Sequence, residues 1–292
     1  MKTRNIETIL PPPPVHFVGD GFRVHNFIPG VHPLSMARMD PFILLDYNSR
    51  YYFPPTDEPR GVGVHPHRGF ETVSIAYKGW IAHHDSFGNS GVIGEGDVQW
   101  MTASSGLLHK EYHEKEFARA GGDFHMVQLW VNLPSWEKMS PPKYQPITNA
   151  QMGKHHLPGN GGLIEVIAGE YRDTPGPAST FTPVALMNAR LNAGGSADFE
   201  FPAYFNTALL VVEGSIRVNG TETVPADHFA LFKNDGEGFT IETIENAIVL
   251  IISGEPILEP IVAHGPFVMN TKTEIYQAFE DVENGKFGQL ED

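Results

Sequence analysis

Two short clusters of metal-binding residue types occur in this sequence, His65-x-His67 and His109-x-Glu111. In a β-strand successive side chains point to opposite faces, so residues i and i+2 point the same way. Each cluster therefore presents two donor groups on one face of a strand. If the two strands face each other inside a small antiparallel barrel, three imidazoles and one carboxylate converge. The spacing predicts a metal site formed by these four residues.

The chemistry of such a site depends on the ion that it holds. Three imidazoles and one carboxylate suit iron, manganese, cobalt, nickel, copper or zinc. An octahedral ion would keep two positions open, as an oxygenase requires, whereas a tetrahedral zinc would be fully surrounded and structural. Because the chain has no cysteine, thiolate ligands and disulfides are excluded. A structural histidine is the alternative for each imidazole, since the chain contains 14 histidines and isolated His-x-His pairs arise by chance.

The elements that must position these residues are short strands. The chain contains 30 glycines and 24 prolines, which separate β-branched and aromatic runs, a pattern typical of a mostly β protein. Besides the strands that carry the two clusters, strands are expected at 41–46, 72–77, 80–84, 98–102, 125–133, 163–168, 183–191, 208–218, 229–232 and 247–253.

Three local signals mark turns and one helix. The Gly-Asp-Gly sequence at 19–21 predicts a hairpin, and Asn-Gly at 219–220 predicts a type I′ hairpin turn. Near the C-terminus, Thr271 and Glu274 have the spacing of a capping box, and Gly285 lies where a helix stop is expected. The sequence therefore predicts one short C-terminal helix.

The length of 292 residues fits one large domain or two ordinary ones. Prolines and glycines without sustained periodicity at 136–162 predict a linker between a domain at 1–135 and a domain at 163–292 that includes the helix. Ten of the 14 histidines lie at or before His125. The first domain is therefore expected to hold the metal, and the second to hold none.

The charge balance limits the partners that the protein can have. The chain carries 35 acidic and 20 basic residues, a formal net charge of −15, so direct binding to nucleic acid is not expected. No apolar stretch has the length of a signal peptide or a membrane span. A cytoplasmic protein without a membrane partner is expected.

Longer segments resemble a known family. The runs HPHRGFETVSIAYKG and DSFGNSGVIGEGDVQWMTASSGLLHKE, together with MDPFILLD, QLWVNLP and GEPILEPIVAHGPFVMNT, resemble the pirin family of the cupin superfamily. The resemblance implies an all-β bicupin, with two antiparallel cupin-type β-barrels in tandem and one metal in the N-terminal barrel. It also implies the ligands His65, His67, His109 and Glu111. One departure is Met126, where relatives often have glycine, and its bulk could narrow the cavity.

Some relatives act as quercetin 2,3-dioxygenases. The resemblance thus implies cleavage of a flavonol-like phenol with O₂ at a mononuclear 3-His-1-Glu site, with carbon monoxide released. The metal would be Fe(II), with Mn, Ni, Co, Cu or Zn as alternatives. Glu111 would be both a ligand and the catalytic acceptor of the substrate's hydroxyl proton. The alternative is a metal-containing regulatory or adaptor protein that binds a transcription factor or a metabolic enzyme, which an acidic surface would suit.

Other residues near the two clusters receive smaller roles. Glu71 matches a general cupin ligand position, but the resemblance favours a supporting or structural role. His83 and His84 are adjacent, so at most one faces the cavity, and His113 is expected on the surface. The residues proposed to line a flat aromatic pocket, with ordinary core packing as the alternative, are Phe70, Trp100 and His125.

Overall fold

The computed structural model describes residues 2–291, which form two compact units. The larger unit consists of residues 13–37, 41–149 and 257–291, and the smaller unit of residues 2–12, 38–40 and 150–256. Each unit therefore includes a segment from the opposite end of the chain. The domain limits of 1–135 and 163–292 remain a prediction. The compact units differ from them at the two ends of the chain, because residues 2–12 belong to the smaller unit and residues 257–291 to the larger one.

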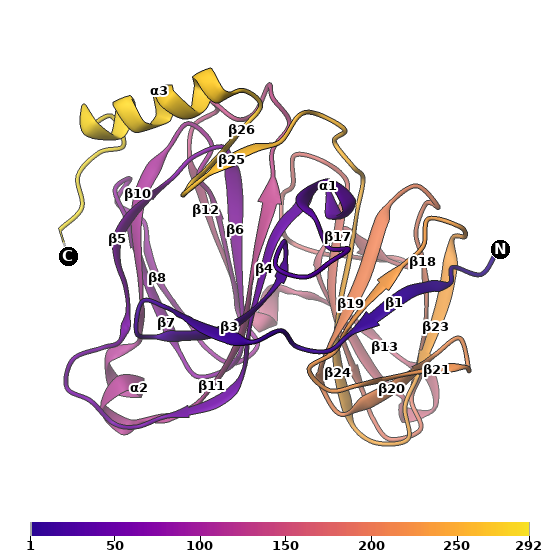
Figure 1. The fold of residues 1–292 in the computed structure, drawn as a ribbon. Helices are drawn as coiled ribbons and strands as arrows, with labels where there is room; N and C mark the ends of the chain where they lie inside the picture. Colours follow the sequence, from indigo (N-terminus) through magenta and orange to yellow (C-terminus); the bar gives the residue numbers. More distant parts are fainter. Residues whose placement is uncertain (1, 292) are drawn as a thin grey trace. The chain divides into compact units, whose positions relative to one another are not determined.

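The larger unit contains two main antiparallel sheets, one of seven strands and one of four (Figure 1). The seven-stranded sheet has the order β12 (Lys143–Ile147), β9 (Val98–Thr102), β6 (Phe70–Lys78), β11 (Gly122–Asn132), β4 (Phe42–Phe53), β3 (Phe22–Ile28) and β2 (Val15–Val18). The four-stranded sheet has the order β5 (Gly61–His67), β10 (Leu107–His113), β7 (Ile81–Asp85) and β8 (Ser90–Ile93). The unit also contains β25 (Val262–His264), β26 (Phe267–Met269), α2 (Lys115–Ala120) and α3 (Lys272–Glu283), whereas the residues of α1 (Met36–Met39) are divided between the two units.

The smaller unit has sheets of the same sizes. Its seven-stranded sheet has the order β1 (Ile6–Leu10), β22 (Phe229–Phe232), β19 (Asn206–Glu213), β24 (Ala247–Gly254), β17 (Val184–Leu191), β14 (Gly162–Ala168) and β13 (Gly153–His156). Its four-stranded sheet has the order β18 (Ser196–Glu200), β23 (Gly238–Glu242), β20 (Ser215–Val218) and β21 (Glu222–Pro225). A separate pair is formed by β15 (Glu170–Tyr171) and β16 (Thr174–Pro175).

The two units repeat one topology. When the sheets of the two units are aligned strand by strand, the strands at equivalent positions occur in the same order along the chain. The edge strands β12 and β1 are the exception. In this correspondence β18 and β23 of the smaller unit match β5 and β10 of the larger unit, which carry the two donor clusters. The expected all-β class with a short C-terminal helix is confirmed, although in each unit the hydrogen bonds form two separate sheets instead of one closed barrel.

The segment 136–162 contains more regular structure than a linker. Strand β12 forms an edge of the seven-stranded sheet in the larger unit, and β13 forms an edge in the smaller unit. Two short 3-10 turns, Asn149–Gln151 and Pro158–Asn160, follow these strands. An edge strand tolerates proline because one row of its N–H groups needs no partner, which explains how Pro146 lies within β12.

The predicted local features are present. Strands β2 and β3 pair across the turn at 19–21, and β20 pairs with β21 across Asn219 and Gly220, both of which have positive φ. Helix α3 has the complete capping box of Thr271 and Glu274 and ends just before Gly285, whose φ is +69°. These features were predictable because each depends on residues within four positions of one another.

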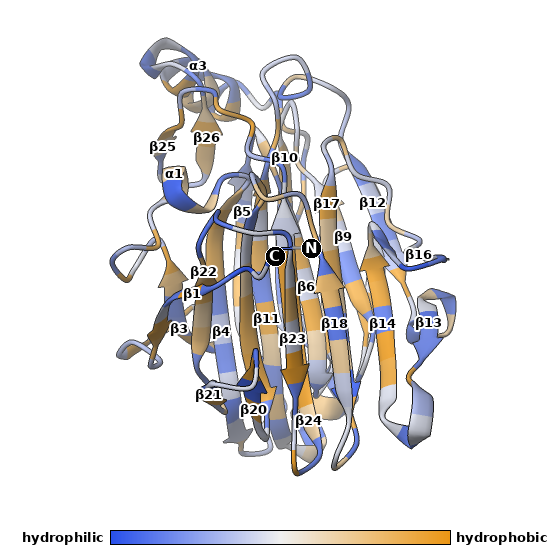
Figure 2. Cartoon of the chain, turned by 90° about the vertical axis from the view of Figure 1, so that its right-hand side faces the viewer, coloured by the Kyte–Doolittle hydropathy of each residue, from blue (hydrophilic) through white to orange (hydrophobic). Residues whose placement is uncertain are grey.

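Hydrophobic residues follow the strands in both units, as the orange bands on β14 and β24 illustrate for the smaller one (Figure 2). In the larger unit, α3 buries Ile275 and Ala278 against Phe267, Met269 and Phe287. The end of β5 is held close to β26, since a Cβ added at Gly69 would lie 2.0 Å from the carbonyl oxygen of Val268. Glycine is therefore required at this turn, where φ is +90°.

Candidate metal centre

Strands β5 and β10 bring three predicted histidines together. The strands are antiparallel neighbours, and His109 lies directly opposite His65. The ring centroids of His65 and His109 are 4.2 Å apart, and those of His67 and His109 are 4.8 Å apart. One nitrogen from each of the three rings lies within 4.8 Å of the other two. Alternation along two paired strands thus produces a group of imidazoles that could hold one metal ion.

Hydrogen bonds leave the ε nitrogens of these rings available. His65 Nδ1 lies 2.8 Å from the carbonyl oxygen of Gly63, and His67 Nδ1 lies 3.4 Å from that of Pro266. Because a carbonyl only accepts, both Nδ1 atoms carry the proton and both Nε2 atoms keep a lone pair. His109 Nε2 is buried and has no hydrogen-bond partner. A buried, unpartnered lone pair beside two others fits a bound metal ion.

Burial also holds these rings in the form that binds metals. Desolvation and the neighbouring His65 lower the pKa of His67 well below its ordinary value. Desolvation, followed by His65, His67 and His83, does the same for the pKa of His109. Neutral imidazole is the ligand form of histidine, so no proton has to be displaced from these two rings at neutral pH.

Glu111 lies two residues beyond His109 on the same face of β10, and its carboxylate contacts residues other than His65 and His67. Its Oε1 accepts hydrogen bonds from Gln99 Nε2 at 3.2 Å and Ser74 Oγ at 3.3 Å, and its Oε2 accepts one from Gln128 Nε2 at 2.9 Å. The carboxylate forms a second group of potential ligands with His109 and His83. The four predicted residues are therefore adjacent, but the structure groups Glu111 with His109 and His83 and not with all three predicted imidazoles.

His83 is a site residue that the sequence interpretation missed. It lies on β7, opposite Glu111 on β10, and it is fully buried, whereas the adjacent His84 is exposed. The expectation that at most one of the two faces inward is confirmed. A signal for His83 was present in the sequence, because His83-x-Asp85 has the same two-residue spacing as the metal clusters.

Glu71 belongs to neither group of potential ligands. Its side chain is buried and accepts a hydrogen bond from Thr102 Oγ1 at 2.7 Å. Burial raises the pKa of this carboxyl to about 7. It lies on β6, in the seven-stranded sheet, where strand alternation separates it from the face that carries Ser74. This placement agrees with the supporting or structural role expected for it.

A pocket of about 360 Å³ opens beside the histidines. Its lining is mostly apolar, and its polar members are Asp46, His65, His67, Glu111 and Gln128. The residues that line it are Val18, Phe22, Val24, Leu44, Asp46, Val62, His65, His67, Glu111, Met126, Gln128 and Trp130.

The expected aromatic lining of the pocket is wrong in all three of its members. Trp100 is fully buried, and His125 is buried with its Nε2 bonded to Tyr47 Oη at 2.8 Å. Phe70 is fully buried and does not line the pocket, and it stacks on Trp130 with ring centroids 4.1 Å apart. The wall is formed instead by even-numbered residues of β11, including Trp130 and Met126, because the odd-numbered His125 points away from them.

The surface position expected for His113 is also wrong. The side chain is 1% exposed and is surrounded by aromatic rings, with the centroid of Phe124 at 4.5 Å and that of Phe53 at 4.6 Å. Its Nε2 donates a hydrogen bond to the carbonyl oxygen of Gly21 at 2.8 Å. On β10 the residues 109, 111 and 113 share one face, so His113 continues the inward row that begins with His109.

His113 is expected to make stability depend on pH. Burial lowers its pKa from 6.5 to about 4, so the unfolded chain binds a proton between these values while the folded chain does not. Stability should therefore fall as the pH drops from 6.5 towards 4, by up to about 3 kcal/mol from this group. Urea unfolding of metal-free protein across this range measures the slope. His113→Gln should flatten the slope, whereas replacement of the exposed His84 by Gln should not.

Two family models match the chain. One, described as Pirin, matches residues 21–131, and the other, described as the Pirin C-terminal cupin domain, matches residues 186–288. Together they cover well over half of the sequence. The chain belongs to the pirin family. This pirin therefore has two cupin domains, as the sequence resemblance implies, and the first family model contains all four predicted ligand positions.

Related proteins match over nearly the whole chain. A Pseudomonas aeruginosa protein, named as a candidate quercetin 2,3-dioxygenase, is 47% identical over 93% of this chain and 94% of its own length. Human pirin is 35% identical over 87% of this chain and 85% of its own length. A crystal structure of quercetin 2,3-dioxygenase from Acinetobacter baumannii has a TM-score of 0.93 at 44% identity and covers 99% of this chain and 100% of that one.

The smaller unit of this pirin has apolar side chains where the larger unit has histidines. Its strands β18 and β23, which correspond to β5 and β10, carry the buried residues Phe199, Phe239 and Ile241. The rings of Phe199 and Phe239 stack with centroids 5.3 Å apart. These side chains fill the interior of this unit. Within residues 2–291, no helix is long and apolar enough to cross a membrane.

Proposed function

We propose that this pirin is a metal-dependent dioxygenase of the quercetin 2,3-dioxygenase type, which cleaves a flavonol-like phenol with O₂. The observation that carries the proposal is the group of three imidazoles with free Nε2 lone pairs beside a mostly apolar pocket of about 360 Å³. The pocket can take in an aromatic substrate, and the lone pairs can hold the ion. The names of its close relatives support the same reaction class.

The proposed ligands are His65, His67, His109 and Glu111, and the proposed ion is Fe(II), with Mn, Ni, Co, Cu or Zn as alternatives. The donor set of nitrogen and oxygen atoms fits these ions, and the buried His109 Nε2 otherwise lacks a partner. When bound, the ion would supply Lewis acidity towards a phenol and the redox chemistry that O₂ requires. The protein must bind the substrate, orient it and move its hydroxyl proton.

Glu111 is the proposed acceptor for the hydroxyl proton of the substrate. Its carboxylate lines the same pocket as His65 and His67. Hydrogen bonds from Gln99, Ser74 and Gln128 fix the direction of both oxygens. A carboxylate held at the end of an apolar slot can take a proton from a bound phenol without rearrangement of the site.

The pocket walls would orient the substrate and exclude water. Trp130 and Phe22 provide flat apolar surfaces, and the Trp130 ring lies against both Phe70 and His67, with centroid separations of 4.1 and 5.1 Å. The Trp130 ring is thus supported from behind and placed beside a proposed ligand. A flat aromatic substrate packed on this ring could bring a hydroxyl group to Glu111, which lines the same pocket.

The test is oxygen consumption by protein loaded anaerobically with Fe(II), measured across a panel of flavonols that includes quercetin. Uptake of one O₂ per substrate, with carbon monoxide released, is the expected result. A fully loaded sample that consumes no oxygen with any member of the panel, when loaded with iron or with manganese, would contradict the proposal.

Removal of the Trp130 ring should weaken substrate binding more than turnover. Trp130→Ala is expected to raise KM about tenfold, because one aromatic stacking contact contributes on the order of 1 kcal/mol beyond the buried area. Leu44→Ala, at another part of the same wall, is the matched control for loss of apolar volume. Steady-state kinetics at saturating metal distinguish the two variants. An unchanged KM in Trp130→Ala would place the substrate elsewhere.

The regulatory or adaptor function, a protein partner and a cytoplasmic location remain predictions from the sequence. Recovery of a stable partner by this pirin, without oxygen uptake on any flavonol, would favour the adaptor function.

A further inference from the structure

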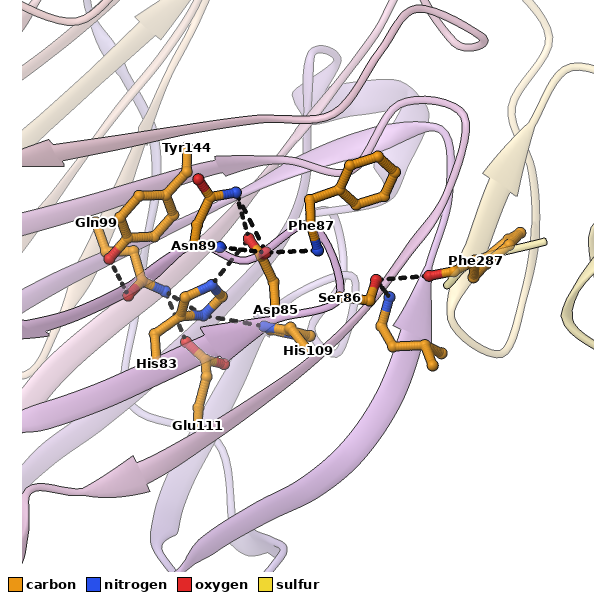
Figure 3. Close-up of polar contacts among 11 residues, drawn as sticks. His83, Asp85, Ser86, Phe87, Asn89, Gln99, His109, Glu111, Tyr144 and Phe287 are labelled. Atoms are coloured by element: carbon orange, nitrogen blue, oxygen red, sulfur yellow. Dashed lines mark hydrogen bonds and ion pairs between the residues drawn. The ribbon is translucent and has the colours of Figure 1, made fainter. Parts of the chain in front are cut away.

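A network of polar side chains connects His109 and Glu111 to Asp85 through His83 and Gln99 (Figure 3). The network lies within the larger unit, and its buried members come from β7, β9 and β10. The proposed function uses only Glu111 and His109 of this network. The protonation of the remaining members follows from which atoms can donate and which can only accept.

The starting point is Gln99, whose amide orientation is fixed at both ends. Its Nε2 lies 3.2 Å from Oε1 of Glu111, and its Oε1 lies 3.2 Å from the hydroxyl of Tyr144. A carboxylate only accepts hydrogen bonds, so the amide nitrogen must face Glu111 and the amide oxygen must face Tyr144. The reversed amide would place two acceptors against each other.

The orientation of Gln99 determines the tautomer of His83. The same Nε2 lies 3.3 Å from His83 Nδ1, and an amide NH₂ can only donate. His83 Nδ1 is therefore the unprotonated nitrogen, and the ring proton is on Nε2. That Nε2 lies 3.4 Å from Oδ2 of Asp85, which accepts the proton's hydrogen bond.

Asp85 is held in place for this role. Its Oδ1 accepts hydrogen bonds from the backbone N–H groups of Phe87 and Asn89, at 2.9 and 3.0 Å. Its Oδ2 also accepts one from Asn89 Nδ2 at 2.9 Å. The turn after β7 thus fixes both oxygens, and the carboxylate cannot rotate away from His83 without losing several of these bonds.

The tautomer of His109 follows from that of His83. The two Nδ1 atoms lie 3.4 Å apart, and His83 Nδ1 is an acceptor, so His109 Nδ1 carries the proton. The lone pair of His109 is then on Nε2, the buried atom without a hydrogen-bond partner. The network therefore directs an imidazole lone pair into the group formed with His65 and His67.

We propose that His83 and Asp85 are positioning residues for the metal centre: the Asp85 carboxylate orients His83, and His83 orients and polarises His109 as a metal ligand. This inference rests on the metal centre of the proposed function, but not on the substrate or on the reaction. Ligating histidines commonly donate their second N–H to an acceptor that fixes the ring and increases its basicity. Here a second histidine is inserted between the ligand and the carboxylate.

The test measures Co(II) affinity by competition with a chelator, for full-length protein without substrate. His83→Phe keeps a ring that can stack on Tyr144, which lies 4.9 Å from the His83 ring, but it removes the three hydrogen bonds to Gln99, His109 and Asp85. His83→Asn loses the ring but can keep an acceptor for His109 Nδ1–H. Asp85→Asn removes the charge while conserving shape. The matched control is His84→Asn, one residue away on the exposed face of β7.

His83→Phe and Asp85→Asn are expected to weaken Co(II) binding about 10- to 100-fold. His83→Asn should recover part of this loss, and His84→Asn should bind like the wild type. The visible spectrum of bound Co(II) should shift in His83→Phe and Asp85→Asn but not in His83→Asn or His84→Asn. Only the first two changes disturb the orientation of the ligand His109. Thermal unfolding of the metal-free variants identifies any that fail to fold.

The reverse order would overturn the proposal. If His83→Phe binds Co(II) as tightly as the wild type while His83→Asn does not, His83 serves packing only. Unchanged Co(II) affinity in Asp85→Asn would also contradict the positioning role of His83 and Asp85, even if the wild type consumes oxygen with a flavonol. Conversely, the expected series of Co(II) affinities without any oxygen uptake would support the positioning role and contradict the proposed dioxygenase function. A wild type that binds no metal would contradict both.

Discussion

Replacement of His65 by alanine is expected to abolish metal binding and oxygen uptake together. The side chain supplies one of three nitrogen donors, and the remaining two belong to the buried His67 and His109. Loss of a direct ligand costs more than loss of a group behind a ligand, for which about 10- to 100-fold in affinity is typical. We therefore expect the affinity for Fe(II) to fall by more than about 100-fold. Elemental analysis after anaerobic loading, followed by oxygen consumption, measures both effects.

The appropriate control is another histidine of the larger unit that lies outside the site. His264 is exposed and packs on Phe279 with ring centroids 5.6 Å apart, so His264→Ala changes neither candidate group. It should retain metal and uptake. If His65→Ala holds a full equivalent of metal, the ion is bound elsewhere, and the second group of His83, His109 and Glu111 becomes the candidate.

The second large effect is expected at the buried ion pair that attaches α3. Arg68 Nη1 lies 2.9 Å from Oδ2 of Asp281, and both side chains are less than a tenth exposed. Arg68 Nε also donates to the carbonyl oxygen of Ser105 at 2.7 Å, and the guanidinium lies over Phe287. Hydrogen bonding by Lys286, together with that of Arg68, lowers the pKa of Asp281 to about 2, so the pair stays charged. Asp281→Asn should reduce stability by about 3–5 kcal/mol, because it leaves a buried cation without its partner.

Urea unfolding of the metal-free protein measures this loss. Glu116→Gln is the matched control, since it breaks an exposed pair with Arg119 at the same distance of 2.9 Å. The control should cost less than about 0.5 kcal/mol. Equal midpoints for Asp281→Asn and Glu116→Gln would show that the buried pair contributes no more than a surface pair.

The parts of the site that could be predicted are those encoded by short spacing. His65, His67 and His109 were identified because a period of two on a strand needs no knowledge of the rest of the fold. The capping box of α3 and the Asn219-Gly220 turn are equally local. The family resemblance added the cupin fold and the proposed chemistry.

The parts that could not be predicted depend on long-range pairing. His83 reaches the site only because β7 pairs with β10, which brings His83 opposite Glu111. Trp130 and not Trp100 lines the pocket because Trp130 pairs with Thr72 and Trp100 pairs with Val73, adjacent residues of β6 whose side chains point to opposite faces of the sheet. His113 was predicted on the surface because its side chain is polar. The aromatic rings that bury it belong to other strands, so the local sequence does not indicate them. The duplicated strand order of the two units is likewise invisible in a sequence without an obvious repeat.

The attachment of β5 to the C-terminal segment bears on when the protein can acquire its metal. His67 Nδ1 bonds to Pro266, and Arg68, the next residue, pairs with Asp281. Pro266 is synthesised 199 residues after His67, and Asp281 is synthesised 213 residues after Arg68. A nascent chain therefore presents the imidazoles before their supports exist. Selective metal capture by a preorganised site has to follow the synthesis of Pro266 and Asp281, so the ion acquired is decided by the pool that the protein meets after that point.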